Sequence, residues 1–317
     1  HYDAAAPAAV LVIKADGSYS FSLGAPVAHG VGVPVFEEDA SLTIGYEVTD
    51  GDGDKAGGFL TVRVNDDTPV AANVTSAVLD DEAQSLFTPV NTGGAGDVSP
   101  DVKTVSGGEG TLFSMGSDGL GSITVAPPAF GVVFKDANGF AQTESVSWSA
   151  GVRGTDGTTT WTATSANYGA AAPAAVLVIK ADGSYTFSLN APLAHSSAGT
   201  SEESRNLDFR YTVRDGDGDE ASARLRIGVN DDTPVSKGAI TATTVLDDDA
   251  FAGGNPGGAG DVANATVATG VAGALFTAGA DGVASVTLTS APAFSVVYSS
   301  NGFTQTEAVS WSQGVTG

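Results

Sequence analysis

The chain has 317 residues, with 37 Asp and Glu against 13 Lys and Arg, a formal net charge of −24 and a pI near 4.1. Such an acidic surface argues against nucleic acid or an anionic membrane as a partner and is compatible with cation binding. Cysteine is absent, which excludes disulfides and thiol chemistry, and 42 glycines with only 16% charged residues are typical of β-structure with many turns.

The sequence repeats itself with an offset of about 165 residues, and such repeats must be found before a fold is assigned. Residues 7–19 return almost unchanged as residues 173–185, and Trp148 returns as Trp311. With Pro69 and Pro234 as unit ends, we predict the C-terminal part of one repeat (1–69), a complete repeat (70–234) and the N-terminal part of the next (235–317). We favour one large sandwich per repeat over two small ones.

The sequence begins with His1 and contains neither a signal-peptide pattern nor an apolar run long enough to span a membrane. We therefore expect a window of a longer protein with no membrane insertion.

Alternation of apolar and polar residues, the period of a half-buried strand, predicts the elements in chain order. A hairpin is predicted at 9–13 and 18–23, and polar composition predicts loops at 30–40, 93–97 and 196–205. Further strands are predicted at 70–79, 110–114, 122–125, 131–134, 145–149, 158–163, 207–213 and 223–229. No useful stretch has a helical period. Many short strands between turns indicate an all-β chain of tandem antiparallel β-sandwich repeats.

The same alternation predicts which side chains form the core of each repeat. In the first copy these are Tyr19, Phe21, Leu42, Ile44, Tyr46, Leu60 and Val62. In the second copy they are Tyr185, Phe187, Leu207, Phe209, Tyr211, Leu225 and Ile227. Trp148 and Trp311 alternate with valines, which favours core positions over sugar-binding platforms.

Each repeat carries three acidic clusters. The Asp-Gly loop contains Asp50, Asp52 and Asp54, and its copy contains Asp215, Asp217 and Asp219. The corner Asn-Asp-Asp-Thr-Pro contains Asp66 and Asp67, and its copy contains Asp231 and Asp232. The third cluster contains Asp80, Asp81 and Glu82, and its copy contains Asp247, Asp248 and Asp249.

Three carboxylates at alternate positions between glycines can surround one cation, and Ca²⁺ takes six to eight oxygen ligands. The alternative is a solvated hairpin turn, because Asp-Gly is a common hairpin signal. Loop and corner lie at opposite ends of one strand of about ten residues, about 30 Å apart at about 3.3 Å per residue. We therefore expect each corner to pair with loops of the neighbouring repeat, with the ions at the junctions.

The run Tyr211 to Asp219, followed by Val229 to Pro234, resembles the repeats of giant type I-secreted RTX adhesins of Gram-negative bacteria. The corner is also similar to the Asn-Asp-x-x-Pro linker through which cadherins bind calcium between domains. The resemblance implies tandem immunoglobulin-like domains in a calcium-stiffened stalk, secreted to the bacterial cell surface for adhesion and biofilm formation. It implies a calcium role for Asp215, Asp217, Asp219, Asp231, Asp232 and their earlier copies.

The same resemblance implies that the partners are neighbouring repeats or identical subunits, with any glycan or host ligand bound outside this segment. The calcium-binding nonapeptide array of that family is not present, because Gly93 to Asp97 is one residue short and stands alone.

Catalytic signatures are not found. The histidines are His1, His29 and His195, and the last two occupy equivalent positions that are typical of loop residues. There is no nucleophile elbow, phosphate loop or His-Glu-x-x-His motif. We predict a non-enzymatic extracellular spacer of a surface adhesin or fibre. The alternatives are a self-assembling filament or surface-layer subunit, in which one molecule's tail completes the next one's head, and a carbohydrate-binding module.

Overall fold

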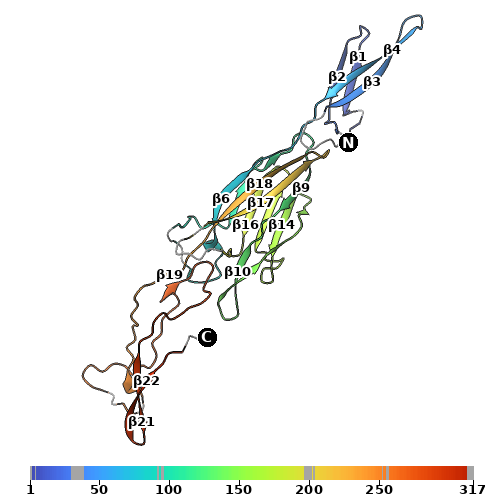
Figure 1. Ribbon diagram of the computed structural model, residues 1–317. Coiled ribbons are helices and arrows are strands. Elements are labelled where there is room, and N and C mark those ends of the chain that lie inside the picture. The colour runs from blue at the N-terminus through green and yellow to red at the C-terminus, as the bar shows by residue number, and fades with distance from the viewer. Residues whose placement is uncertain are drawn as a thin grey trace.

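The computed structural model describes residues 2–3, 5–29, 39–90, 93, 96–195, 202, 204–251, 253–254 and 257–312. This part of the chain is all-β, as predicted, and contains no α-helix. None of its helices has the length and apolar character needed to cross a membrane. Figure 1 shows an elongated molecule, in which the first and last strands lie at opposite ends of a larger central body. We refer to residues 1–69, 70–234 and 235–317 as the first, middle and last segments.

The first and last segments contain two-stranded sheets. In the first segment these are the hairpins β1 (Ala9–Ile13) with β2 (Tyr19–Leu23) and β3 (Ala40–Thr49) with β4 (Lys55–Val64). In the last segment they are β19 (Val235–Ser236) with β20 (Phe276–Thr277) and β21 (Phe294–Ser300) with β22 (Phe303–Val309). A short 3₁₀ helix, η2 (Asp248–Ala250), lies between β19 and β20.

The middle segment is built on two larger sheets. The four-stranded sheet has the order β6 (Val74–Asp80), β18 (Glu220–Asn230), β17 (Ser204–Asp215), β9 (Leu120–Ala126). The path of the other sheet is β12 (Ser147–Trp148), β14 (Thr158–Thr164), β15 (Ala175–Lys180), β16 (Tyr185–Leu189), β7 (Thr104–Gly107), with β13 (Val152–Arg153) also paired to β14. The middle segment also contains two separate strand pairs, β5 (Val70–Ala71) with β8 (Phe113–Ser114) and β10 (Gly131–Lys135) with β11 (Ala141–Ser145). A short 3₁₀ helix, η1 (Asp81–Gln84), follows β6.

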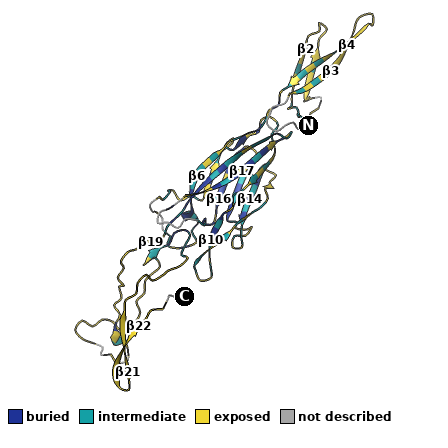
Figure 2. Ribbon diagram, viewed as in Figure 1, coloured by how far each residue is buried: buried dark blue, intermediate teal, exposed yellow. Residues whose placement is uncertain are grey.

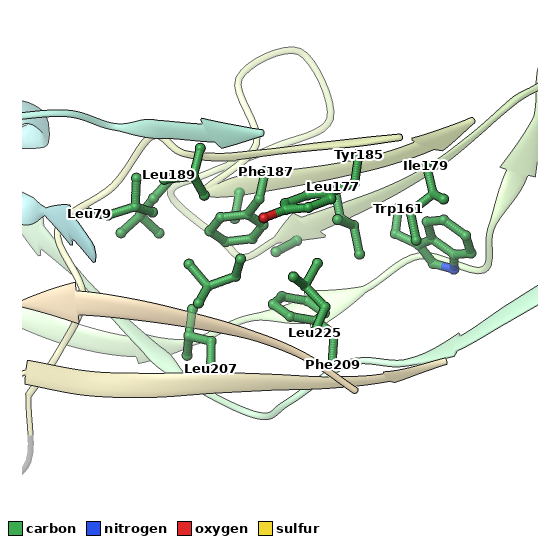
Figure 3. Close-up of a cluster of buried hydrophobic side chains, with 14 of the residues drawn as sticks. Leu79, Trp161, Leu177, Ile179, Tyr185, Phe187, Leu189, Leu207, Phe209 and Leu225 are labelled. Carbon is green, nitrogen blue, oxygen red and sulfur yellow. The ribbon is translucent and has the colours of Figure 1, made fainter. Parts of the chain in front are cut away.

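One hydrophobic core lies between these two sheets and gives the middle segment a sandwich-like character. Leu177 and Phe187 of one sheet meet Leu207 and Phe209 of the other, and all four side chains are buried (Figure 3). All seven core positions predicted for the second copy are buried, because each strand of period two turns alternate residues inward. The members of this one cluster run from Leu79 to Val229 in the sequence.

One strand pair departs from the antiparallel prediction. β6 and β18 pair in parallel, with Val74 opposite Leu225 and Asp80 opposite Asn230. The chain enters the middle segment at one end and leaves at the other, so its entering and leaving strands run in the same direction. Because these two strands are also neighbours in the sheet, their pairing is parallel.

Several strand boundaries also differ from prediction. Residues 70–79 form two strands, β5 and β6, and of residues 110–114 only Phe113 and Ser114 are paired. The stretch 145–149 is divided between β11 and β12, and β7 was not predicted. The predicted loops at 30–40 and 196–205 lie largely outside the described residues, although Ala40 and Arg205 belong to strands. Of the loop at 93–97, only residues 93, 96 and 97 are described.

The core predicted for the first copy is wrong for the chain as it stands. Tyr19 and Tyr46 are exposed, and Phe21, Leu42, Ile44, Leu60 and Val62 are only half-buried. Figure 2 shows the same contrast along the molecule, with exposed end segments and a buried central body. The reason is that the described part of residues 1–69 contains counterparts of β15 to β18 but none of β6, β7, β9 or β14, the strands that extend the two sheets on both sides in the middle segment.

The two repeated tryptophans show this difference as well. Trp148 packs edge-on against Phe130 and Phe209 at the border of the core, as predicted. Trp311 is exposed, and its core assignment is wrong in this chain, because the described part of the last segment forms only two-stranded sheets. Both indoles still donate to an equivalent proline carbonyl oxygen, that of Pro128 or Pro292.

Candidate metal sites at the junctions

The corner has the same local geometry in both copies. In the first, the backbone amide of Asp67 donates to Asp66 Oδ1 at 2.8 Å, and in the second the amide of Asp232 donates to Asp231 Oδ1 at 2.9 Å. In each copy, the carboxylate of the first corner aspartate is therefore fixed by a hydrogen bond from the next residue's backbone amide, immediately after a long strand ends.

The Asp-Gly loop is a tight turn held by its first aspartate. Asp215 Oδ1 accepts from the amides of Gly218 and Asp219 at 2.9 and 2.7 Å. Gly218 has a φ of 121°, a backbone conformation that glycine adopts at little cost. These bonds use one oxygen of Asp215 and leave the carboxylates of Asp217 and Asp219 outside the turn's own hydrogen bonds.

The earlier copy of this loop forms the same turn, with Asp50 Oδ1 accepting from Gly53 and Asp54 at 3.1 and 2.9 Å. Its carboxylates Asp50, Asp52 and Asp54 are also close enough together to hold one ion, but all three are exposed. The two copies therefore differ in their surroundings, and only the later copy is covered by another segment.

The first junction brings together the corner of the first segment and two loops of the middle segment. His29, Asp66, Asp118 and Asp217 each place one ligand atom within 4.8 Å of the others. His29 Nδ1 lies 3.0 Å from Asp66 Oδ1 and 3.7 Å from Asp217 Oδ2. Asp217 Oδ2 also accepts from the backbone amide of His29 at 3.2 Å. The corner thus meets the Asp-Gly loop of the following repeat, as the strand length led us to expect.

The second junction repeats this arrangement between the middle and last segments. His195 Nδ1 lies 3.2 Å from Asp231 Oδ1 and 3.6 Å from Asp81 Oδ2. Asp81, His195 and Asp281 could hold one ion together. His195 and Asp231 are the counterparts of His29 and Asp66, and Asp281 is the counterpart of Asp118.

Glycines allow the two segments of each junction to approach this closely. A Cβ atom at Gly116 would lie 2.4 Å from Asp67 Oδ2, and one at its counterpart Gly279 would lie 2.5 Å from the Asp232 carbonyl oxygen. A side chain at Gly279 would therefore require the backbone of the corner to shift, and one at Gly116 would require the Asp67 side chain to move.

The third acidic cluster joins the second junction through the parallel pairing of β6. Because β6 ends beside the end of β18, Asp80, Asp81 and Glu82 lie at the same end of the middle segment as the corner at Asp231 and Asp232. Glu82, Glu202 and Asp232 form one possible cation group, and Asp80, Glu82 and Asp101 form another. The sequence analysis does not predict that this cluster meets the following corner.

In the last segment, Asp247 repeats the turn of Asp80. Asp247 Oδ1 accepts from the amide of Asp249 at 3.1 Å, as Asp80 Oδ1 accepts from the amide of Glu82 at 3.1 Å. Asp247 is buried and Asp248 is exposed.

Burial and mutual repulsion make the junction carboxylates hard to ionise. Burial, with the charges of Asp101 and Asp97, raises the pKa of Asp80 to about 6. Burial and the charge of Asp232 raise the pKa of Glu82 to about 8.

The pKa values of Asp118 and of its counterpart Asp281 are raised as well. Burial, with the nearby Asp217, raises the pKa of Asp118 to about 6. Burial raises the pKa of Asp281 to about 7, although His195 acts in the opposite direction. Burial also lowers the pKa of His195, but Asp231 outweighs this effect, so the net direction for the ring is upward.

The donor set fits a bound cation. In the described part of the chain, both oxygens of Asp81 and of Glu82 are buried without a hydrogen-bond donor, as is one oxygen each of Asp118, Asp215 and Asp217. Buried polar atoms in native proteins almost always have a partner. Clustered carboxylate oxygens with no donor are the ligands that hard divalent cations require.

The sequence analysis does not predict several residues of these candidate sites, which are His29, His195, Asp101, Asp118, Glu202 and Asp281. The signal for two of them was present in the sequence, because Gly-x-Asp-Gly occurs at 116–119 and again at 279–282. The histidine was seen to repeat but was interpreted as a loop residue.

Comparison of the sequence with models of known protein families and with curated proteins found no match.

Proposed function

We propose that this chain is part of a calcium-stiffened extracellular repeat array, the spacer of a bacterial surface adhesin or fibre. In this proposal the repeats are immunoglobulin-like sandwiches placed end to end, as in the RTX adhesins that the sequence resembles. Its role is structural rather than catalytic. It holds an adhesive part of the protein at a distance from the cell surface.

The observation that carries the proposal is the convergence of buried carboxylates from two successive segments at each junction. Within the described residues, the ion pairs of Asp66, Asp81 and Asp217 are with histidine rings, and no lysine or arginine pairs with them. Like charges this close repel strongly when they are shielded from water. A divalent cation would turn that repulsion into a bridge between segments.

Such a bridge couples calcium to stiffness. Extracellular calcium modules bind with dissociation constants of about 10⁻⁴ to 10⁻³ M. At a hundredfold excess of ion over the dissociation constant, each filled site adds about 2.7 kcal/mol. Domains without disulfides are stable by only about 5–15 kcal/mol, so a few ions decide whether the junctions are rigid.

Melting curves test the calcium part of the proposal. Chelation should lower the melting temperature, and calcium should raise it more than sodium does at matched ionic strength. Screening of an acidic surface responds to ionic strength alone. Coincident curves in the two salts would therefore contradict the proposal.

Solution scattering tests the stalk. In millimolar calcium the molecule should be extended, and chelation should add bending at the junctions. The triple variant Asp215→Ala, Asp217→Ala, Asp219→Ala should bend even in calcium. The matched control is the exposed copy, Asp50→Ala, Asp52→Ala, Asp54→Ala, which should leave the overall dimensions unchanged. A compact particle in calcium would count against a spacer.

A self-assembling filament or surface-layer subunit is the alternative, because both end segments expose large apolar side chains such as Phe59 and Phe303. An increase of the particle mass with protein concentration, measured by sedimentation, would favour the filament.

A further inference from the structure

We propose that the histidine at each junction is a metal ligand through Nδ1, so that the junction binds a first-row transition-metal dication of the Zn²⁺ or Co²⁺ class through nitrogen and oxygen. This inference rests on the proposed function, because it assumes that the junctions are cation sites. It goes beyond that function by assigning a ligand other than oxygen and a different class of ion.

The backbone determines which ring nitrogen is free. His29 Nε2 lies 3.2 Å from the carbonyl oxygen of Val64, and His195 Nε2 lies 3.5 Å from that of Val229. A carbonyl oxygen only accepts, so Nε2 carries the proton in each ring. The neutral tautomer then has its lone pair on Nδ1. The proton on the far nitrogen bonded to a backbone carbonyl is the usual arrangement of a metal-binding histidine.

Nδ1 faces carboxylates without hydrogen bonding to them. His29 Nδ1 is 3.0 Å from Asp66 Oδ1, yet it makes no hydrogen bond among the described residues. The side chain of His29 is only 6% exposed. In the neutral tautomer the Nδ1 lone pair and the carboxylate oxygens of Asp66, Asp118 and Asp217 lie within 4.8 Å of one another, an arrangement in which they could bind one cation together.

The second junction reproduces the arrangement with a different set of oxygens. His195 Nδ1 also lacks a hydrogen bond among the described residues, and its side chain is 5% exposed. Its nearest carboxylates are Asp231, the counterpart of Asp66, and Asp81, which comes from β6 rather than from the Asp-Gly loop. The histidine, the corner aspartate and the strand-end carbonyl are therefore common to both junctions.

The chemistry of these donors sets the class of ion. Calcium prefers sites made only of oxygen, whereas imidazole suits Zn²⁺, Co²⁺, Ni²⁺ and similar ions. The exposed loop Asp50, Asp52, Asp54 has no histidine in its group and keeps an all-oxygen character. The chain thus offers two kinds of site, one of oxygen only and one of mixed donors.

The double variant His29→Asn, His195→Asn tests this assignment in the full 317-residue chain. The asparagine side-chain oxygen can occupy the position of Nδ1, so the junction becomes an oxygen-only site. Wild type and variant are titrated with Co²⁺, followed by its visible absorption, and then with Zn²⁺ and Ca²⁺ by calorimetry. Melting in calcium shows whether the variant is folded, and each single variant reports on one junction.

We expect the double variant to lose Co²⁺ and Zn²⁺ affinity by at least about 10- to 100-fold, because that range already applies to residues that only support metal ligands. Its calcium affinity should change much less. Equal Co²⁺ affinity and equal spectra for the two proteins would overturn the assignment. So would calcium and Co²⁺ affinities that fall together, because the histidine would then act only as a positive charge or a packing element.

The outcomes separate this inference from the proposed function. Calcium stabilisation with no histidine-dependent Co²⁺ binding overturns the inference and leaves the calcium-stiffened spacer standing. Histidine-dependent Co²⁺ binding with no effect of calcium supports the inference and contradicts the calcium part of the proposed function. No binding of either ion contradicts both.

Discussion

Asp232 accepts a hydrogen bond at 2.9 Å from the backbone amide of Ala280, a residue of the following segment. Its counterpart Asp67 accepts in the same way from Ser117 at 3.0 Å. Each corner therefore has two aspartates with different neighbours. The first faces the histidine, and the second binds the backbone of the next segment directly.

We predict that Asp232→Ala loosens the second junction even in chelator, when no ion contributes. Ala280 is fully buried, so the substitution leaves its amide without the acceptor, at a cost of about 1–3 kcal/mol. Amide exchange at Ala280 is the measurement, and Asp232→Asn, which keeps an acceptor oxygen, is the control. Exchange that is unchanged in Asp232→Ala would refute the role of this bond.

In chelator, we predict that stability falls as pH rises from about 4 to about 8. The pKa values of Asp80, Asp281 and Glu82 in the folded state are raised to about 6, 7 and 8, respectively. Carboxyls of an unfolded chain titrate near about 4, so the folded state holds more protons across this window, and a higher pH favours unfolding.

Saturating calcium should abolish or reverse this trend, because the ion competes with protons for the same oxygens. Melting temperatures measured over the pH series, with and without calcium, provide the test. A melting temperature in chelator that rises steadily with pH would show that these carboxylates are not destabilised in the folded protein.

We predict that Tyr211→Phe destabilises the middle segment by about 1–2 kcal/mol. The Tyr211 hydroxyl lies 2.6 Å from the carbonyl oxygen of Ala72 and 2.5 Å from that of Leu112, so it ties β17 to two loops. The matched control is its exposed counterpart, Tyr46→Phe, which should change stability by less than about 0.5 kcal/mol. Denaturant unfolding in calcium measures both, and equal effects would contradict the prediction.

We also predict an unequal effect of one substitution made in the two copies of the repeat. Phe187→Ala removes a fully buried ring and should cost about 3–5 kcal/mol. Phe21→Ala changes the equivalent position, which is half-buried here, and should cost clearly less. Denaturant unfolding followed by far-UV circular dichroism, which reports on the strands of all segments, would detect the difference in stability. A larger loss of stability for Phe21→Ala than for Phe187→Ala would contradict this account of the core.

The fold of the middle segment could be predicted largely from alternation. Leu207, Phe209, Tyr211 and Val213 are all buried in β17, because period two allows only one face of a strand to turn inward. The same pattern failed for Tyr19 and Tyr46, since alternation shows which face of a strand is apolar but not whether another sheet covers it.

The candidate sites could be predicted in part. Strand length alone indicated that a corner must meet a loop of the next repeat, and Asp66 does lie beside Asp217. Glu82 lies beside Asp232 because β6 pairs in parallel with β18. This neighbourhood could not be predicted, because no local sequence pattern encodes the order of strands in a sheet. The roles of His29 and His195 depend on what faces Nδ1, which spacing in the sequence does not reveal.

The parallel pairing of β6 and β18 has a consequence for a molecule held under tension. A pull along the chain enters the middle segment at β5, reaches the start of β6 and leaves at the end of β18. It therefore draws β6 and β18 in opposite directions along their common axis. Their backbone hydrogen bonds then resist together in shear, instead of opening one at a time like a zipper. The strands that receive the load are those that carry Asp80 and Asp231 to the second junction, so a cation held there would lie on the line of force.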